Sequence, residues 1–225
     1  MRARPRTVAV MTVTLLGVVS GCVGGTEGSA PSSPAARATV SESASPMAYT
    51  SKAFAVPFTV SVPASLGTRP AQDTRTFLTW DRSESDKVRF LLPVVVYPPG
   101  KNEPVKPPGS YRAYLALLRG LTDYHAKWRD RVGTKVDGHP ATLMTATTDW
   151  SLNGTLGCPE ADGDAHDDCY GLQPEYTQRL AVIDIGARTP LVSWTTVNTD
   201  QQRDTAAEFA RFEAMLRSVR FSDAS

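Results

Sequence analysis

The side chains best suited to chemistry in this sequence are three histidines, His125, His139 and His166. A histidine that acts as a general base needs a neighbouring group that orients it, and the sequence offers no such group that stands out beside any of the three. The motifs of serine hydrolases, zinc proteases and phosphate-binding loops are missing from the chain. We therefore expect no catalytic residues, no cofactor and no enzymatic activity.

A short acidic segment between Cys158 and Cys169 is the sharpest local feature. Carboxylates crowded on a loop can bind Ca²⁺, which takes several oxygen ligands. The register differs from that of an EF-hand loop, because Gly163 directly follows the first aspartate and no glutamate closes the loop. We favour a solvated loop over a calcium site and assign no metal ligand. The acidic residues around His166 are Glu160, Asp162, Asp164, Asp167 and Asp168.

The amino terminus has the pattern of an export signal. Arginines and no acids occur within residues 1–7, and a nearly continuous apolar run follows over residues 8–19. This run is too short to remain as a membrane-spanning helix, which takes about 20 apolar residues. The pattern predicts a secretory signal peptide over residues 1–21.

Val19, Ser20, Gly21 and Cys22 resemble the lipobox of bacterial lipoproteins, in which an aliphatic residue and two small residues precede the cysteine that is acylated. The resemblance implies that Cys22 is the lipidation site and the first residue of the mature protein. Several acyl chains on one cysteine anchor a protein stably, because each buried CH₂ contributes about 0.8 kcal/mol. We expect a lipid anchor on the extracytoplasmic face of the cell membrane. An ordinary cleaved signal with an incidental cysteine is the alternative.

Composition divides the rest of the chain into a tether and one domain. Residues 22–52 are mostly small or polar, and such a segment cannot bury enough apolar surface to order itself. Residues 53–225 have the length of a single globular domain. Signal cleavage removes three arginines and no acids, so the formal net charge falls from +1 to −2. This charge argues against a nucleic-acid partner or an anionic lipid surface.

Cys158 and Cys169 are the cysteines that remain beside Cys22, and they lie close together in an exported chain. Thiols oxidise outside the cytoplasm, so we expect a Cys158–Cys169 disulfide. A zinc site or a catalytic thiol would need further cysteines or a well-placed histidine, and the Cys-x-x-Cys spacing of such sites is missing.

Apolar periodicity predicts an antiparallel-rich α+β domain. Strict alternation predicts a strand over 54–62, at a sheet edge because Pro57 cannot donate a hydrogen bond. Ser110 is the expected N-cap of a helix whose apolar stripe runs to Trp128. The other expected elements are strands over 76–81, 88–97, 132–136, 141–150, 178–186 and 191–197, and a helix over 204–217.

Four segments of this pattern resemble uncharacterised actinobacterial lipoproteins with a PsbP-like α/β/α fold. They are the Phe-x-Val-Pro opening at Phe54 and the segments Val136 to Ala141, Leu180 to Gly186 and Leu216 to Phe221. The resemblance implies an antiparallel-rich sheet flanked by two long helices. It also implies a non-enzymatic accessory or binding role, and it transfers no site residue to this chain.

We expect a membrane-anchored lipoprotein that binds an envelope protein or another envelope component and catalyses no reaction. The alternative is a small-ligand carrier with a cavity between the first helix and the sheet, lined by residues such as Tyr111, Tyr114 and Trp128. A third possibility is an enzyme of an unrecognised type.

Overall fold

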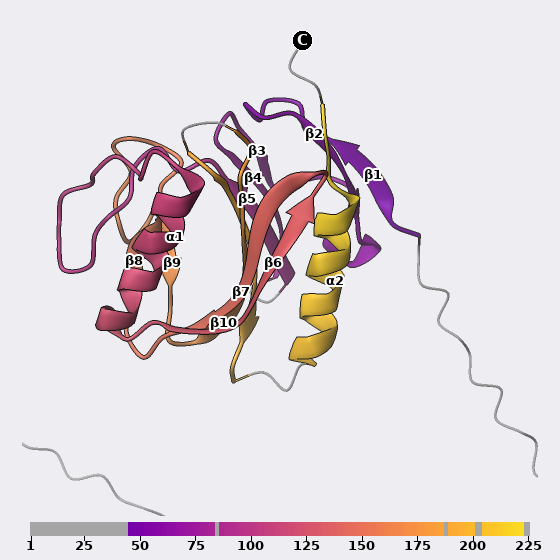
Figure 1. Ribbon diagram of the computed structural model, residues 1–225. Helices are drawn as coiled ribbons and strands as arrows, with labels where there is room; N and C mark the ends of the chain where they lie inside the picture. The colour runs from indigo at the N-terminus through magenta and orange to yellow at the C-terminus, as the bar shows by residue number, and fades with distance from the viewer. Residues whose placement is uncertain (1–44, 84–85, 187–188, 201–203, 223–225) are drawn as a thin grey trace, which may run out of the picture. The chain divides into compact units, whose positions relative to one another are not determined.

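The computed structural model describes residues 45–83, 86–186, 189–200 and 204–222 (Figure 1). The expected signal peptide, Cys22 and most of the expected tether lie outside the described residues. A first strand, β1 (Met47–Thr50), lies within the segment that composition assigns to the tether. Tyr49 of this strand donates a hydrogen bond of 2.7 Å from its hydroxyl to Asp73, which ties β1 to the folded domain.

A seven-stranded antiparallel sheet forms the centre of the domain, in the order β3-β4-β5-β11-β10-β7-β6. Successive side chains of a strand point to opposite faces. In β10, Leu180 and Val182 therefore enter one apolar core while Ala181 and Ile183 enter another. The strands are β3 (Gln72–Asp73), β4 (Phe77–Ser83), β5 (Asp86–Leu91), β6 (Lys127–Val136), β7 (His139–Thr147), β10 (Tyr176–Ile183) and β11 (Leu191–Asn198).

One face of this sheet packs against α2 (Thr205–Ser218) and a three-stranded sheet of β1, β2 (Phe58–Val62) and β12 (Arg220–Phe221). A short 3₁₀ turn, η1 (Ala64–Leu66), follows β2. The core between these layers is rich in aromatic residues, with Phe58, Trp80, Phe90 and Phe212 all fully buried.

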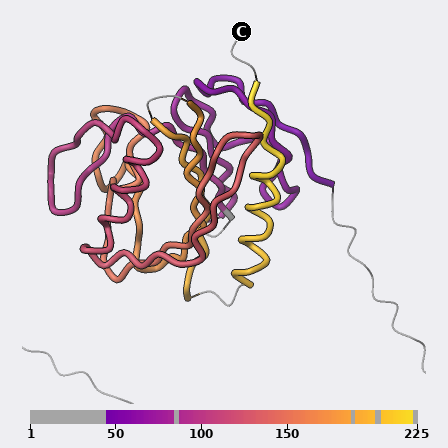
Figure 2. The backbone as a smooth tube through the Cα atoms, viewed as in Figure 1, coloured from indigo at the N-terminus to yellow at the C-terminus, as the bar shows by residue number. Residues whose placement is uncertain are grey.

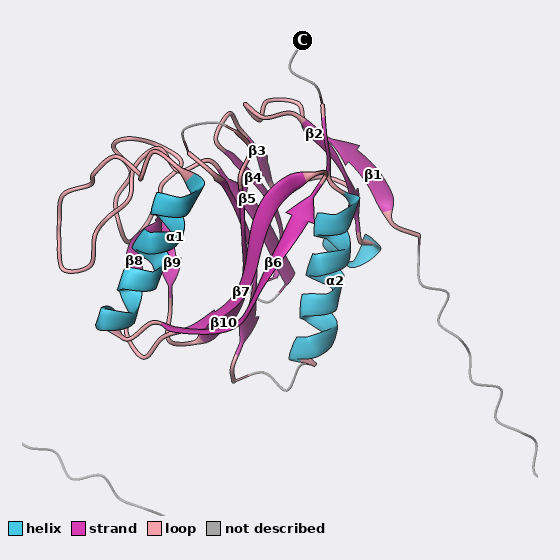
Figure 3. Cartoon of the chain, viewed as in Figure 1, coloured by secondary structure: helices cyan, strands magenta, loops and turns pink. Residues whose placement is uncertain are grey.

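The opposite face packs against α1 (Tyr111–Gly120), the 3₁₀ turn η2 (Leu121–Tyr124) and the hairpin of β8 (Leu152–Gly157) and β9 (Tyr170–Leu172). Figures 1 and 3 show α1 and α2 on opposite sides of the central strands, and Figure 2 follows the same chain path. Two independent cores therefore hold the central sheet from both sides.

The prediction of two long flanking helices is wrong, because α1 has 10 residues and α2 has 14. The expected stripe to Trp128 is broken at His125, whose left-handed φ of 72° turns the chain into β6. Trp128 then pairs with Ala146 in the sheet. Leu121 stays buried in the turn, so the apolar repeat is satisfied without a helix. The three-stranded sheet and the β8–β9 hairpin cover the parts of the central sheet's two faces that the short helices do not cover.

Prolines set the boundaries of two expected strands. The strand expected over 54–62 begins only at Phe58, after Pro57, and it is the central strand of its sheet and not an edge. Pro57 lies before the ladder, where its carbonyl accepts a 2.9 Å hydrogen bond from Ser222. The strand expected over 88–97 ends at Leu91, just before Pro93. The N-cap prediction is confirmed, since the Ser110 hydroxyl accepts from Ala113 N at 3.2 Å.

Candidate functional site: a cleft around Arg89

The three histidines lie on separate elements, each with a local contact. The His125 ring is stacked on exposed Trp150, with centroids 5.3 Å apart. His139 Nδ1 lies 3.0 Å from the carbonyl oxygen of Asp184, and His166 Nδ1 lies 2.6 Å from Asn153 Nδ2. Within the described residues, none of these ring nitrogens is hydrogen-bonded to a carboxylate. The structure does not bring the histidines together into one site.

The acidic loop is organised by its own backbone. Asp164 Oδ1 accepts hydrogen bonds from the backbone N–H groups of His166 and Asp167, at 2.8 and 3.2 Å. These two bonds lower the pKa of the Asp164 carboxyl. Asp168 in turn accepts from the Asp164 backbone at 3.0 Å. In the part of the chain that the structure describes, no three acidic, histidine or cysteine side chains form a cluster that could hold a metal ion.

The disulfide prediction is confirmed. Cys158 and Cys169 are bonded, with their Cα atoms 4.3 Å apart. The backbone of Cys158 forms a bridge to Val95, with its N–H donating to the Val95 carbonyl at 2.9 Å. The bond therefore fixes the start of β9 against the segment that follows β5.

The aromatic residues proposed for a helix-to-sheet cavity are used in packing. Tyr114 is fully buried, and its hydroxyl donates to the Leu156 carbonyl at 2.5 Å. The Tyr111 and Thr142 hydroxyls are 2.6 Å apart. Trp128 lies on β6, outside α1.

A different cleft lies on the α1 side of the central sheet, at the end where β5, β11 and β10 carry polar residues. Because side chains alternate along a strand, Arg89 of β5, Trp194 of β11 and Gln178 of β10 point to the same face. Tyr170 of β9 forms a wall. The cleft has a volume of about 140 Å³ and is lined by Lys87, Arg89, Cys169, Tyr170, Gly171, Gln173, Tyr176, Gln178, Trp194 and Thr196.

Arg89 is the less exposed of the two cations that line this cleft, with 13% of its side chain exposed. Its Cζ lies 5.4 Å from the Tyr170 ring centroid and 5.8 Å from that of Trp194. Burial lowers the pKa of the guanidinium, while the neighbouring Tyr170 and Asp81 oppose this shift. An arginine in a protein nevertheless stays protonated near neutral pH. The site therefore holds a partly buried positive charge next to two aromatic rings.

The N–H donors of Arg89 have no acceptor among the described residues. A guanidinium carries five in-plane N–H donors, and stacking on a ring satisfies none of them. The nearest carboxylate oxygen, Asp81 Oδ2, is 3.9 Å from Nη2, which is beyond hydrogen-bond distance. The same oxygen lies 3.4 Å from Lys87 Nζ. Arg89 is among the residues that line the cleft.

Gln178 lines the same cleft and carries an unmatched acceptor. Only 2% of this residue is exposed, and its Nε2 donates to the Gly171 carbonyl at 3.0 Å. This bond fixes which end of the amide is the oxygen, because only the NH₂ group can donate to a carbonyl. Its Oε1 is buried and has no hydrogen-bond partner among the described residues. A buried acceptor without a partner costs about 1–3 kcal/mol, which a bound donor would recover.

Arg179 provides a comparison, because its side chain is hydrogen-bonded within the domain. It lies on the opposite face of β10, where its Nε donates to Glu213 Oε1 at 2.9 Å. Its Nη2 lies 2.8 Å from the same oxygen, and its Nη1 donates to Thr145 Oγ1 at 2.9 Å. Arg179 is buried and Arg89 is partly buried, but only Arg179 has protein acceptors close enough for hydrogen bonds. Arg89 lacks such acceptors, as we expect of an arginine whose hydrogen bonds are made to a ligand.

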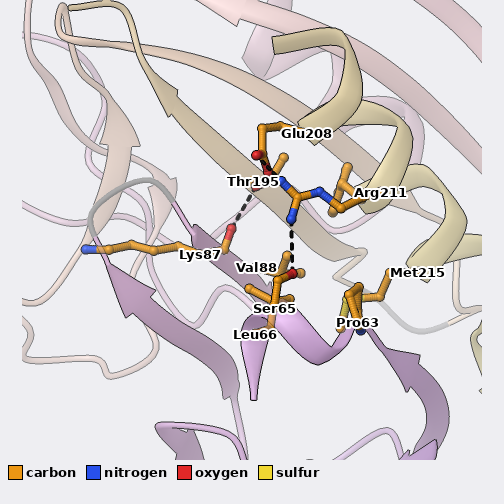
Figure 4. A pocket seen from close by; sticks show the side chains of 10 residues that line it. Pro63, Ser65, Leu66, Lys87, Val88, Thr195, Glu208, Arg211 and Met215 are labelled. Atoms are coloured by element: carbon orange, nitrogen blue, oxygen red, sulfur yellow. Dashed lines mark hydrogen bonds and ion pairs between the residues drawn. The ribbon is translucent and has the colours of Figure 1, made fainter. Parts of the chain in front are cut away.

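Two other cavities are weaker candidates. Figure 4 shows the first, between α2, β5 and η1, where Arg211 pairs with Glu208 and donates to Ser65 Oγ at 3.0 Å. Its volume of about 20 Å³ holds a water molecule but no organic ligand. The second, of about 390 Å³, lies between residues 97–102 and the disulfide loop. Among its polar lining residues, Asn153 already contacts both His166 and Gln173.

The sequence patterns did not identify Arg89 or Gln178 as site residues. The available signal was a charged residue inside an otherwise apolar run, Val88-Arg89-Phe90-Leu91.

Comparison of the sequence with models of known protein families and with curated proteins finds no match. Among the described residues, no helix is long and apolar enough to cross a membrane.

Proposed function

We propose that this protein is a lipid-anchored extracytoplasmic binding protein, held by Cys22, whose domain binds an anionic group of an envelope component in the Arg89 cleft. It catalyses no reaction. The resemblance to actinobacterial lipoproteins and the location outside the cytoplasm form part of this proposal. The confirmed Cys158–Cys169 disulfide supports that location, because such bonds persist in oxidising compartments.

The observation that carries the binding proposal is the Arg89 side chain, which has no protein hydrogen-bond acceptor among the described residues. A cation that is mostly covered by protein loses part of its hydration, and here no protein hydrogen bond offsets that loss. A ligand that accepts hydrogen bonds from Arg89 would offset this loss. Charge-assisted hydrogen bonds between a guanidinium and a carboxylate or phosphate are among the strongest in proteins.

The anchor is tested by intact-mass analysis of the protein extracted from its native membrane. We expect a mature chain that begins at Cys22 and carries a diacylglycerol-sized addition. The Cys22→Ala variant should lack the addition and leave the membrane fraction, because without acyl chains it has no anchor. An unmodified chain cut at another residue would contradict lipidation and place the protein among secreted proteins.

Anion binding is tested by thermal unfolding of the mature protein in acetate or phosphate at constant ionic strength. A ligand at ten times its Kd stabilises the native state by about 1.4 kcal/mol, which raises the Tm of a domain of this size by about 3 °C. We expect this rise for at least one of the two anions in the wild type and none in Arg89→Met. Equal shifts in both proteins, or no shift in either, would contradict binding at Arg89.

A further inference from the structure

The geometry of the cleft points to a specific ligand class, and this inference rests on the proposed function. We propose that the Arg89 cleft binds a carboxylate with a neighbouring amide N–H, as at the end of a peptide or in a free N-acylated amino acid. The carboxylate accepts from Arg89, and the N–H donates to Gln178 Oε1.

The charge of the cleft suits a monoanion. The described charged groups at Arg89 are Arg89 itself, Lys87 and Asp81, and Asp81 Oδ2 lies 3.4 Å from Lys87 Nζ and 3.9 Å from Arg89 Nη2. Within 4 Å of each other, one carboxylate and two cations leave a single net positive charge at Arg89, and Asp168 acts electrostatically on the Tyr170 wall. That charge is matched by a carboxylate, whereas a phosphate carries more negative charge near neutral pH and would also lie close to Asp81.

The unmatched oxygen of Gln178 selects for a hydrogen-bond donor. Arg89 and Gln178 belong to β5 and β10, which are separated by β11, so the strands lie about 10 Å apart. Both side chains nevertheless line the same cleft. A ligand between them lies close to the Arg89 donors on the β5 side and to a side chain with a buried, unpaired acceptor on the β10 side. An amide N–H next to a carboxylate has this arrangement of opposite hydrogen-bonding groups.

The size and the walls of the cleft fit one amino-acid residue. Its volume of about 140 Å³ far exceeds the 10–15 Å³ that one water molecule requires. The rings of Tyr170 and Trp194, with centroids 5.2 Å apart, provide an apolar wall. Such a wall excludes water from the charged pair and strengthens it. The ligand would therefore be bound through its end and not along a long surface.

The test is isothermal titration calorimetry of the mature protein with four matched probes. N-acetylglycine carries both groups, 4-oxopentanoate replaces the N–H by CH₂, N-acetylglycinamide lacks the carboxylate, and inorganic phosphate is the competing anion. We expect N-acetylglycine to bind at least tenfold more tightly than 4-oxopentanoate or phosphate, because the analogue without N–H leaves Gln178 Oε1 unpaired. N-acetylglycinamide should bind at least 100-fold more weakly.

Three variants separate the roles of the residues. Arg89→Met should abolish binding of N-acetylglycine. Gln178→Met should remove the discrimination, so that N-acetylglycine and 4-oxopentanoate bind alike. Arg211→Met, whose side chain lies in the α2 cavity outside the cleft, is the matched control and should bind as the wild type does.

The outcomes distinguish this inference from the proposed function. Arg89-dependent binding of phosphate or 4-oxopentanoate at least as tight as that of N-acetylglycine would overturn the inference and leave anion binding intact. If none of the four probes binds, the inference is overturned, and the absence of any effect of acetate or phosphate on the Tm would overturn the proposed function as well. Tighter binding of acetyl-triglycine than of N-acetylglycine would identify the end of a peptide as the source, and the reverse would identify a free N-acylated amino acid.

Discussion

Replacement of Arg179 by methionine should lower the free energy of unfolding by about 3 kcal/mol. The side chain is 9% exposed, and removing it leaves Thr145 without its charged donor and Glu213 with only Arg217, at 3.9 Å. Replacement of Arg89 by methionine should leave that free energy unchanged or raise it, because methionine fills similar volume and removes a partly buried charge that lacks protein acceptors. Urea unfolding of both variants measures the difference.

This pair of variants decides whether Arg89 is structural. Both variants lose a guanidinium group from a strand of the same sheet and gain the same methionine side chain, so they can be compared directly. A loss of more than about 2 kcal/mol in Arg89→Met would show that its ring contacts and Asp81 stabilise the fold, and the reason for assigning it to a ligand would disappear.

Removal of the disulfide by the double substitution Cys158→Ala and Cys169→Ala should lower the free energy of unfolding by about 3 kcal/mol. The bond closes a loop between residues 11 positions apart, for which the loss of chain entropy in the unfolded state gives roughly this value. Cys169 also lines the cleft and precedes Tyr170, so ligand binding should weaken with the loss of that wall.

The matching measurement is urea unfolding of the wild type with and without a reductant. The reduced wild type should have the same midpoint as the double variant, because both lack the cross-link. A double variant as stable as the oxidised wild type would contradict a stabilising role for the bond.

Several elements of the fold were predicted from the sequence because their signals are local. The helix α2 follows Asp204, whose carboxylate accepts from Ala206 N and Ala207 N, and it buries Phe212 and Leu216 as the stripe predicts. The strands expected over 178–186 and 191–197 lie within a few residues of the bounds of β10 and β11. Each of these signals depends on neighbours within a few positions along the chain.

The first helix was predicted too long because two structures satisfy the same apolar spacing. Leu121 and Trp128 fit a helical stripe, yet the chain turns at His125 and places Trp128 in β6. The strands β8 and β9 were not predicted, since glycines interrupt their apolar pattern and a disulfide loop separates them. Long-range pairing, which sequence spacing does not encode, decided both outcomes.

The cleft could not be predicted for the same reason. Arg89, Gln178 and Trp194 are far apart in the chain, and they meet because β11 pairs with both β5 and β10. The burial of Arg89 depends further on Tyr170, which β9 carries to the same place. The sequence shows the residue types, but the strand order determines that a cation and an unmatched amide oxygen line one cleft.

The most direct test of this account is a crystal structure of the mature protein with N-acetylglycine. We expect a carboxylate oxygen at about 2.7–2.9 Å from an Arg89 guanidinium nitrogen and the amide nitrogen within hydrogen-bond distance of Gln178 Oε1. A cleft that stays empty, with the Arg89 donors hydrogen-bonded to protein carbonyl oxygens, would contradict the account and make Arg89 a structural residue.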